Sequence, residues 1–257
     1  MSERVARRTF LGLSAGLFAA SLAVSVVWRR AMAAASEPPC GWTAMIGWAP
    51  MPGQSVHAVA ASFLGMWTVM MVAMMMPSLL PVLWRYRLRI GRAGTGQAGV
   101  LAALVGLGYF LAWSMLGLVA LPLTLALGAL ATRLPMPGRD IPVVLGTVVA
   151  AAGALQFTPW KVRHLAHCRA VSARDCVPSA HAVEALGAGL YLGRHCIASC
   201  AGAAAIVVAT GAMDLAVMAV VTSAITLERW VPNGARTVQC LGALAIAAGG
   251  WLIASGM

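Results

Sequence analysis

The sequence predicts an all-α protein, a polytopic transmembrane helical bundle of about seven spans. Hydrophobic residues make up 61% of the chain and charged residues only 10%, and the mean hydropathy is +0.85. A soluble domain carries roughly 25% charged residues. Uncharged apolar stretches of about 20 residues recur, and a helix of that length crosses a hydrocarbon core of about 30 Å. These observations indicate an integral membrane protein.

The candidate spans follow one another through the whole chain. They are residues 9–28, 57–83, 98–128, 141–159, 182–209, 213–228 and 237–256. Proline and glycine punctuate the connections, as at Pro52, Gly94 and Pro137. We therefore expect residues 1–257 to form a single membrane domain, with the first helix and an outside loop in 1–56 and the rest of the bundle in 57–257.

Basic residues predict the orientation. An N-terminus in the cytoplasm places these basic residues inside: Arg4, Arg7, Arg8, Arg85, Arg87, Arg89, Arg92, Lys161, Arg163, Arg169, Arg174, Arg229 and Arg236. Only Arg29, Arg30, Arg133 and Arg139 then lie outside, the asymmetry that the positive-inside rule describes. Topology thus explains most of the net charge of +11, and because the cations flank spans, no nucleic acid partner is expected. The predicted location is a bacterial inner (cytoplasmic) membrane, multi-pass, with the lipid bilayer as partner.

The first segment has an alternative interpretation. Arg7 and Arg8 before an apolar stretch resemble a twin-arginine export signal, and Ala33 and Ala35 could suit a peptidase. Trp28 and the two arginines after it separate the apolar stretch from that site. An uncleaved first helix is the expected state.

Methionine is concentrated in the second span. Six of the 15 methionines fall between Met66 and Met76, and Met66, Met70 and Met74 share one helical stripe while Met71 and Met75 share another. A thioether fills irregular gaps in apolar packing, but it is also a ligand for soft metals such as Cu(I). Packing and metal binding both remain open for this stripe.

The fifth span carries a stripe of small residues and thiols. Gly189, Gly193, Cys196 and Cys200 lie on one face, where a neighbouring backbone can approach closely. Two thiols four residues apart could present two sulfurs to one ion, and His195 could join them from the adjacent stripe. A tight interface of small residues explains the same pattern, because cysteine behaves as a small hydrophobe.

A third cluster follows the fourth span. If the chain is helical there, His164 and Cys168 share a face and His167 lies close to both, an acceptable spacing for nitrogen and sulfur ligands. A basic loop beside lipid headgroups is the alternative. Of the other cysteines, Cys40 has no exposed outside partner, and Cys168 and Cys176 are expected to stay reduced in the cytoplasm.

Arg194 is an unusual charge near the middle of the fifth span. It is expected to face the bundle or a polar cavity, opposite the cysteine stripe, and to reach a group on another helix or subunit. Asp214 and Glu228, near the ends of the sixth span, are interpreted as boundary residues.

Several motifs together resemble a known family. They are Met66 to Pro77, Gln156 to Lys161, His167 to Arg169, Cys196 to Cys200, Gly211 to Leu215, and Glu228. This pattern is similar to the bacterial domain-of-unknown-function 2182 family, whose members are described as predicted metal-binding integral membrane proteins. The resemblance runs from about residue 57 to the end. Ser199 stands where that family tends to have a third cysteine.

Two functions are compatible with the sequence. The first is binding of a soft metal, most simply copper, for delivery, storage or transport. Its candidate ligands are Met66, Met70, Met74, His164, His167, Cys168, His195, Cys196 and Cys200. The second is a non-catalytic accessory or assembly subunit of a larger membrane complex. No enzyme is predicted, since the chain has neither an HExxH nor a Walker motif and its seven acidic residues are scattered.

Overall fold

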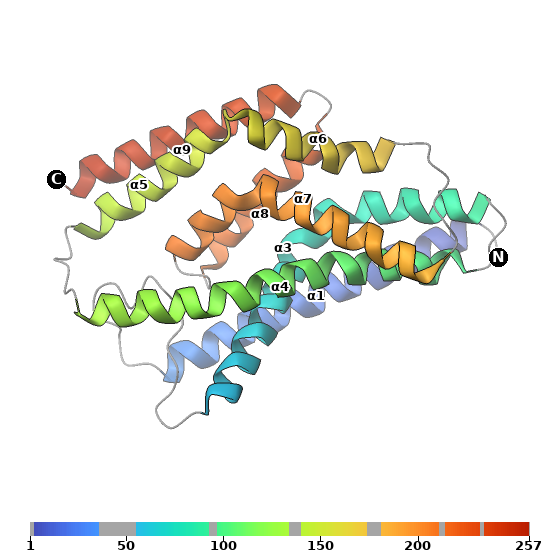
Figure 1. Cartoon of the computed structure of the whole chain (residues 1–257), viewed down its shortest axis with the longest axis horizontal. Helices are drawn as coiled ribbons and strands as arrows, with labels where there is room; N and C mark the ends of the chain where they lie inside the picture. The colour runs from blue at the N-terminus through green and yellow to red at the C-terminus, as the bar shows by residue number, and fades with distance from the viewer. Residues whose placement is uncertain are drawn as a thin grey trace.

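The structure, a computed structural model, describes residues 3–35, 55–92, 97–133, 140–173, 181–210, 214–231 and 234–256. Within these ranges the chain is helical and contains no strand (Figure 1). The helices are α1 (Glu3–Ala35), α3 (Val56–Arg92), α4 (Ala98–Arg133), α5 (Asp140–Leu155), α6 (Pro159–Ala173), α7 (Ala182–Ala209), α8 (Leu215–Trp230) and α9 (Gly234–Gly256). The predicted all-α fold class is confirmed for the described part of the chain.

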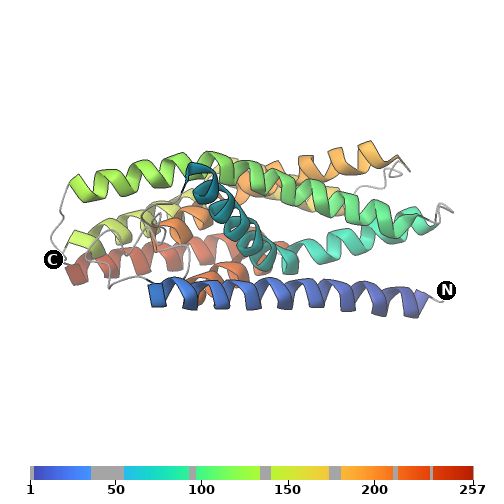
Figure 2. The ribbon, with the colours of Figure 1, turned by 90° about the horizontal axis from the view of Figure 1, so that it is seen from below.

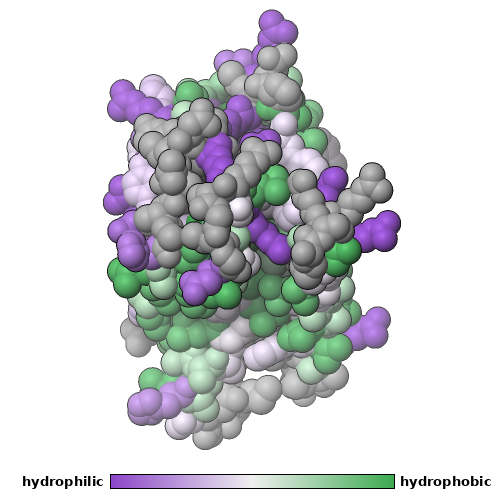
Figure 3. All heavy atoms as spheres, turned by 90° about the vertical axis from the view of Figure 1, so that its right-hand side faces the viewer, coloured by the Kyte–Doolittle hydropathy of each residue, from purple (hydrophilic) through white to green (hydrophobic). Residues whose placement is uncertain are grey.

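The helices run broadly along one axis, and the two ends of the chain lie at opposite ends of it (Figures 1 and 2). The most extensive helix pairs are α5 with α9, α4 with α7, and α3 with α4. Helix α1 lies along the outside of the bundle against α3 (Figure 2). Figure 3 looks onto the end that carries the N-terminus and shows many hydrophilic side chains there.

Glycine allows α4 and α7 to pack with their backbones in contact. A Cβ atom built on Gly189 would lie 2.2 Å from the carbonyl oxygen of Val105, and one on Gly108 would lie 2.3 Å from that of Leu186. No side chain larger than hydrogen fits such an approach without moving the helices apart. The predicted close-packing stripe on the fifth span is confirmed, and its partner is α4.

Because the two backbones touch at Gly189, adding a single methyl group there should strongly lower the stability of the bundle. We expect Gly189→Ala to destabilise the bundle by about 1–3 kcal/mol or more, because the new Cβ meets backbone atoms that cannot rotate away. Gly187→Ala is the matched control, since no atom lies within 4 Å of a Cβ there and alanine favours a helix by about 1 kcal/mol. Unfolding in mixed micelles measures both variants. Equal stability of the two would contradict the close contact.

The predicted polytopic helical bundle is supported, while the number of seven spans stays a prediction. Among the described residues, five helices are long and apolar enough to cross a membrane, namely α1, α3, α4, α7 and α9, and α5 with α6 adds a sixth if that bent pair is one span. The expected fourth span, 141–159, is wrong as a straight helix, because α5 ends at Leu155 and α6 leaves it at 64°. The predicted sixth span corresponds to α8, whose 16 residues reach only about 24 Å.

Local sequence explains where these helices begin and bend. Pro159 occupies the first position of α6, where its missing N–H costs nothing, and the hydroxyl of Thr158 accepts a hydrogen bond from the Lys161 amide at 3.3 Å. The Asp214 carboxylate caps α8 by accepting from the amides of Ala216 and Val217, which confirms Asp214 as a boundary residue. Pro77 and Pro81 lie inside α3, which bends along its length (Figure 1).

Candidate metal centre

The methionines of α3 surround a small cavity in the interior of the bundle. Its lining includes Met70, Met71, Met74 and Met75 from α3 and Cys200 from α7, together with Trp67 and Trp113. The free space is about 10 Å³, close to the volume of one water-sized sphere. All four thioethers are buried. The structure thus brings the methionine-rich and cysteine-bearing helices together at one place.

Beside this cavity, the Cys196 sulfur lies at ligand spacing from two other sulfur atoms. The Sγ atoms of Cys196 and Cys200 are 3.9 Å apart, and the Sδ atom of Met75 is 4.0 Å from the Sγ atom of Cys196. Three sulfurs placed about 2.3 Å from one ion in a plane are about 4.0 Å from each other. The expected convergence of Met70 and Met74 with the cysteines stays a prediction, because Cys196 and Cys200 lie four residues apart on α7 and their spacing does not test it. Met75, on the other stripe of α3, was not among the predicted ligands.

Arg229 is the cationic partner of the thiols. Its guanidinium donates to Cys196 Sγ at 2.6 Å, lies 3.9 Å from Cys200 Sγ and reaches the hydroxyl of Ser78 at 3.4 Å. The hydroxyl of Tyr109 lies 2.8 Å from Cys196 Sγ on another side. A cationic donor at this distance stabilises a thiolate. The positive-inside rule explained Arg229 as a cytoplasmic residue, so its contact with the thiols was not predicted.

A buried ion pair fixes the helix that carries Arg229. The ammonium of Lys161 lies 2.8 Å from Glu228 Oε2 and donates to the Ser199 carbonyl at 2.6 Å, and the Gln156 amide donates to Glu228 Oε1 at 3.1 Å. Arg169 donates to the carbonyl oxygen of Glu228. Glu228 lies near the end of α8, as the boundary interpretation expected, but it is only 3% exposed and is paired with Lys161, which that interpretation did not predict. These bonds join α6, α7 and α8 directly beside the thiols.

The histidines form a separate group between α6 and α7. The Nδ1 atoms of His164 and His195 are 2.9 Å apart, and the ring of His167 stacks on that of His195 with centroids 4.7 Å apart. His195 is buried and its Nε2 atom has no hydrogen-bond partner, whereas His167 is exposed. Segment 159–173 is helical, as the ligand spacing required. His164 nevertheless faces His195, while Cys168 lines a different cavity with Arg229.

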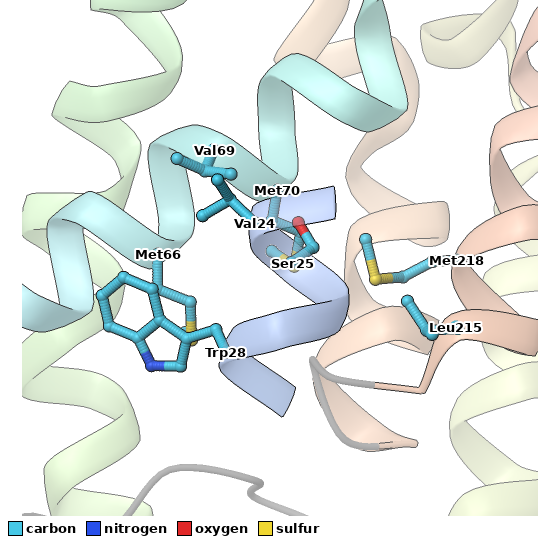
Figure 4. A pocket seen from close by; sticks show the side chains of 8 residues that line it. All are labelled: Val24, Ser25, Trp28, Met66, Val69, Met70, Leu215 and Met218. Atoms are coloured by element: carbon cyan, nitrogen blue, oxygen red, sulfur yellow. The ribbon is translucent and has the colours of Figure 1, made fainter. Parts of the chain in front are cut away.

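Two other predicted features lie away from the thiols. Met66 helps to line an apolar cavity with Trp28 and Met218, between α1, α3 and α8 (Figure 4).

Arg194 is exposed, while Cys196 and Cys200 on the same helix are buried. The prediction that the arginine and the cysteines lie on opposite sides of α7 is confirmed. Its guanidinium lies 4.9 Å from the ring centroid of Tyr191 on its own helix. The expectation that it faces the bundle is wrong.

The free thiols of the described residues are Cys168, Cys196, Cys200 and Cys240, of which only Cys240 is exposed. Cys40 and Cys176 lie outside the described residues. In the described ranges no group of three or more His, Cys, Asp and Glu side chains is placed to hold a metal ion. To the Cys196 and Cys200 thiols the structure adds a thioether, that of Met75, and two thiols with a thioether are a donor set that fits a soft monovalent ion.

Comparison with known proteins identifies the family. No curated protein and no solved structure matches the chain. A family model, PpoB2, described as a copper chaperone, matches residues 64–252, which is more than half of the chain and includes all three sulfur residues. The match supports a copper-related family and does not support the domain-of-unknown-function label that the motifs suggested. The chain belongs to the PpoB2 family of copper chaperones.

Proposed function

We propose that this protein is an integral membrane copper chaperone that holds one Cu(I) ion on Cys196, Cys200 and Met75 and passes it on. The observation that carries the proposal is the spacing of 3.9 and 4.0 Å between three buried sulfur atoms contributed by α3 and α7. Two thiolates and a thioether are the donors that Cu(I) prefers. Met70, Met71 and Met74, which line the adjoining cavity, supply further thioethers along α3.

The charges around the thiols favour a monovalent cargo. A partly buried guanidinium needs a negative partner, and the partners of Arg229 are two sulfurs and a hydroxyl. One thiolate balances Arg229 when no metal is bound. Cu(I) on two thiolates carries one net negative charge, which Arg229 also balances. A divalent ion would leave an uncompensated positive charge in an apolar interior, which is costly.

The membrane arrangement extends this proposal. We propose seven membrane crossings, with the short α8 added to the six candidate spans. An odd number of crossings puts the two ends of the chain on opposite sides of the membrane, and Figure 1 places them at opposite ends of the bundle. The basic asymmetry supports a cytoplasmic N-terminus and a bacterial inner membrane. The proposed role is non-catalytic delivery or storage. Other membrane subunits are possible recipients of the copper, and His164, His167 and His195 remain a prediction for the point where metal enters or leaves.

The accessory-subunit alternative makes the opposite prediction about metal. Packing alone accounts for buried methionines, but it gives no reason for an arginine to point at a pair of thiols. Copper content of the protein purified in detergent separates the two functions. About one Cu(I) per chain supports the chaperone, and a protein that takes up no copper supports the structural role.

Selectivity provides the sharper test. We expect wild-type protein loaded with Cu(I) to resist exchange with Zn(II), and Arg229→Gln to increase the relative affinity for Zn(II) by about tenfold or more, because a unit charge a few ångströms away has been removed. Arg163→Gln is the control, as Arg163 is an exposed arginine on α6. Metal analysis after competition measures the ratio. An unchanged ratio would contradict the charge argument.

A further inference from the structure

A second cavity leads from Arg229 toward the end of the bundle that carries the N-terminus. It holds about 260 Å³, and its lining includes Ser78, Arg85, Cys168, Arg169 and Arg229. Ser78 and Arg85 lie on one stripe of α3, seven residues apart, so the cavity follows that helix away from the thiols. We call this space the arginine vestibule.

The vestibule is strongly positive. Three guanidinium groups line it, and none of its described lining residues carries a carboxylate. The nearest buried acid, Glu228, directs its carboxylate at Lys161 and Gln156 instead. Such a lining repels a bare metal cation and concentrates anions. The proposed copper centre lies next to this vestibule, because Arg229 belongs to both. Copper that enters by the vestibule must therefore pass three positive charges.

We propose that the arginine vestibule receives copper as an anionic Cu(I)–thiolate complex and that Cys168 is the first protein thiol to contact the metal. This inference rests on the proposed function. Two thiolates around Cu(I) give a complex with one net negative charge, which three arginines attract. Cys168 is a free thiol buried in the wall of the vestibule, which Arg229 also lines. Arg229 joins the two sites, because it lines the vestibule and also contacts both buried thiols.

Transfer is then an exchange of thiolate ligands with no change in oxidation state. The protein begins with one thiolate and one thiol at Cys196 and Cys200. Copper first exchanges one carrier thiolate for Cys168, whose proton leaves with that carrier as a thiol. Copper then moves to Cys196 and Cys200 with formation of two Cu–S bonds, the proton of their remaining thiol returns to Cys168, and the second carrier departs as a thiolate. The total charge is the same before and after, and Arg229 faces a single negative charge on the two thiol residues in both the starting and the final state.

The test compares two copper donors of opposite charge. Full-length protein in a non-ionic detergent is mixed with Cu(I) bis-glutathione, an anion, or with tetrakis(acetonitrile)copper(I), a cation. Copper retained by the protein is measured at a series of times after rapid desalting. We expect Arg85→Gln to slow uptake from the glutathione complex by about three- to tenfold and not to slow uptake from the acetonitrile complex. Added salt should slow the wild-type reaction with glutathione and affect the variant less.

Controls separate this inference from the proposed function. Arg85→Lys keeps the charge and should retain fast uptake, and Arg163→Gln removes an exposed arginine that is not part of the vestibule. The final amount of bound copper should be equal in all variants. Equal slowing with both donors, or no slowing with either, would overturn the anionic-carrier inference while leaving the copper centre intact. Failure of the wild-type protein to bind copper from either donor would overturn the proposed function itself.

Discussion

Replacing both thiols of the centre, Cys196→Ser with Cys200→Ser, is expected to remove Cu(I) binding. Bound copper should fall from about one ion per chain to a small residue, since a hydroxyl is a poor ligand for a soft ion and Met75 alone cannot hold it. Each single variant should weaken binding strongly, because two sulfurs then remain of three. Cu(I) competition with a chromophoric chelator measures the affinity.

The chain provides a matched control for these substitutions. Cys240 is a free thiol exposed on α9, and Cys240→Ser should leave copper binding unchanged. Cys168→Ser should slow loading without lowering the final copper content, because Cys168 lines the vestibule and is not one of the three closely spaced sulfurs. Full copper retention by the Cys196 and Cys200 double variant would place the metal elsewhere, with the histidine group as the next candidate.

The second large effect concerns stability. We expect Glu228→Gln to lower the free energy of unfolding by about 3–5 kcal/mol, because it leaves the buried Lys161 ammonium without its negative partner. Lys161→Met should lower the free energy of unfolding by a similar amount, because it leaves the buried Glu228 carboxylate without its positive partner. Unfolding in mixed micelles, followed by the near-ultraviolet signal of tryptophan, measures the loss.

The double variant tests the cause. Removing both charges, Lys161→Met with Glu228→Gln, should be less destabilising than the sum of the two single changes, since no unpaired charge then remains in the interior. Glu184→Gln is the control, as Glu184 is exposed in the first turn of α7 and its loss should cost at most about 1 kcal/mol. Additive losses in the double variant would show that the ion pair is not the source of the effect.

Local pattern was sufficient to predict one half of the centre. The spacing of Gly189, Gly193, Cys196 and Cys200 specifies a single face of a helix, and the structure confirms both the close approach and the thiol pair. The choice of methionine could not be made in this way. The apolar part of helix α3 carries methionine on two stripes, so periodicity does not show that Met75 is the thioether that lies 4.0 Å from Cys196 Sγ.

The charged partners could not be predicted because they are distant in sequence. Arg229 lies 33 residues from Cys196, and Glu228 lies 67 residues from Lys161. Arg229 and Lys161 also fit the positive-inside rule. Membrane topology therefore already explained both charges, and no sequence pattern indicated that they have buried partners. The fourth span failed for another reason. Mean hydropathy does not register the turn at Gln156–Thr158 before Pro159, where the helix changes direction by 64°.

X-ray absorption at the copper K edge of the loaded protein tests the central claim most directly. A Cu(I) ion on Cys196, Cys200 and Met75 predicts an edge typical of Cu(I) and a first shell of three sulfur atoms at about 2.3 Å. Met75→Leu should reduce that shell to two sulfur atoms, or allow Met70 or Met74 to replace the missing one. A first shell of nitrogen atoms that persists when Cys196 and Cys200 are replaced by serine would contradict the sulfur centre.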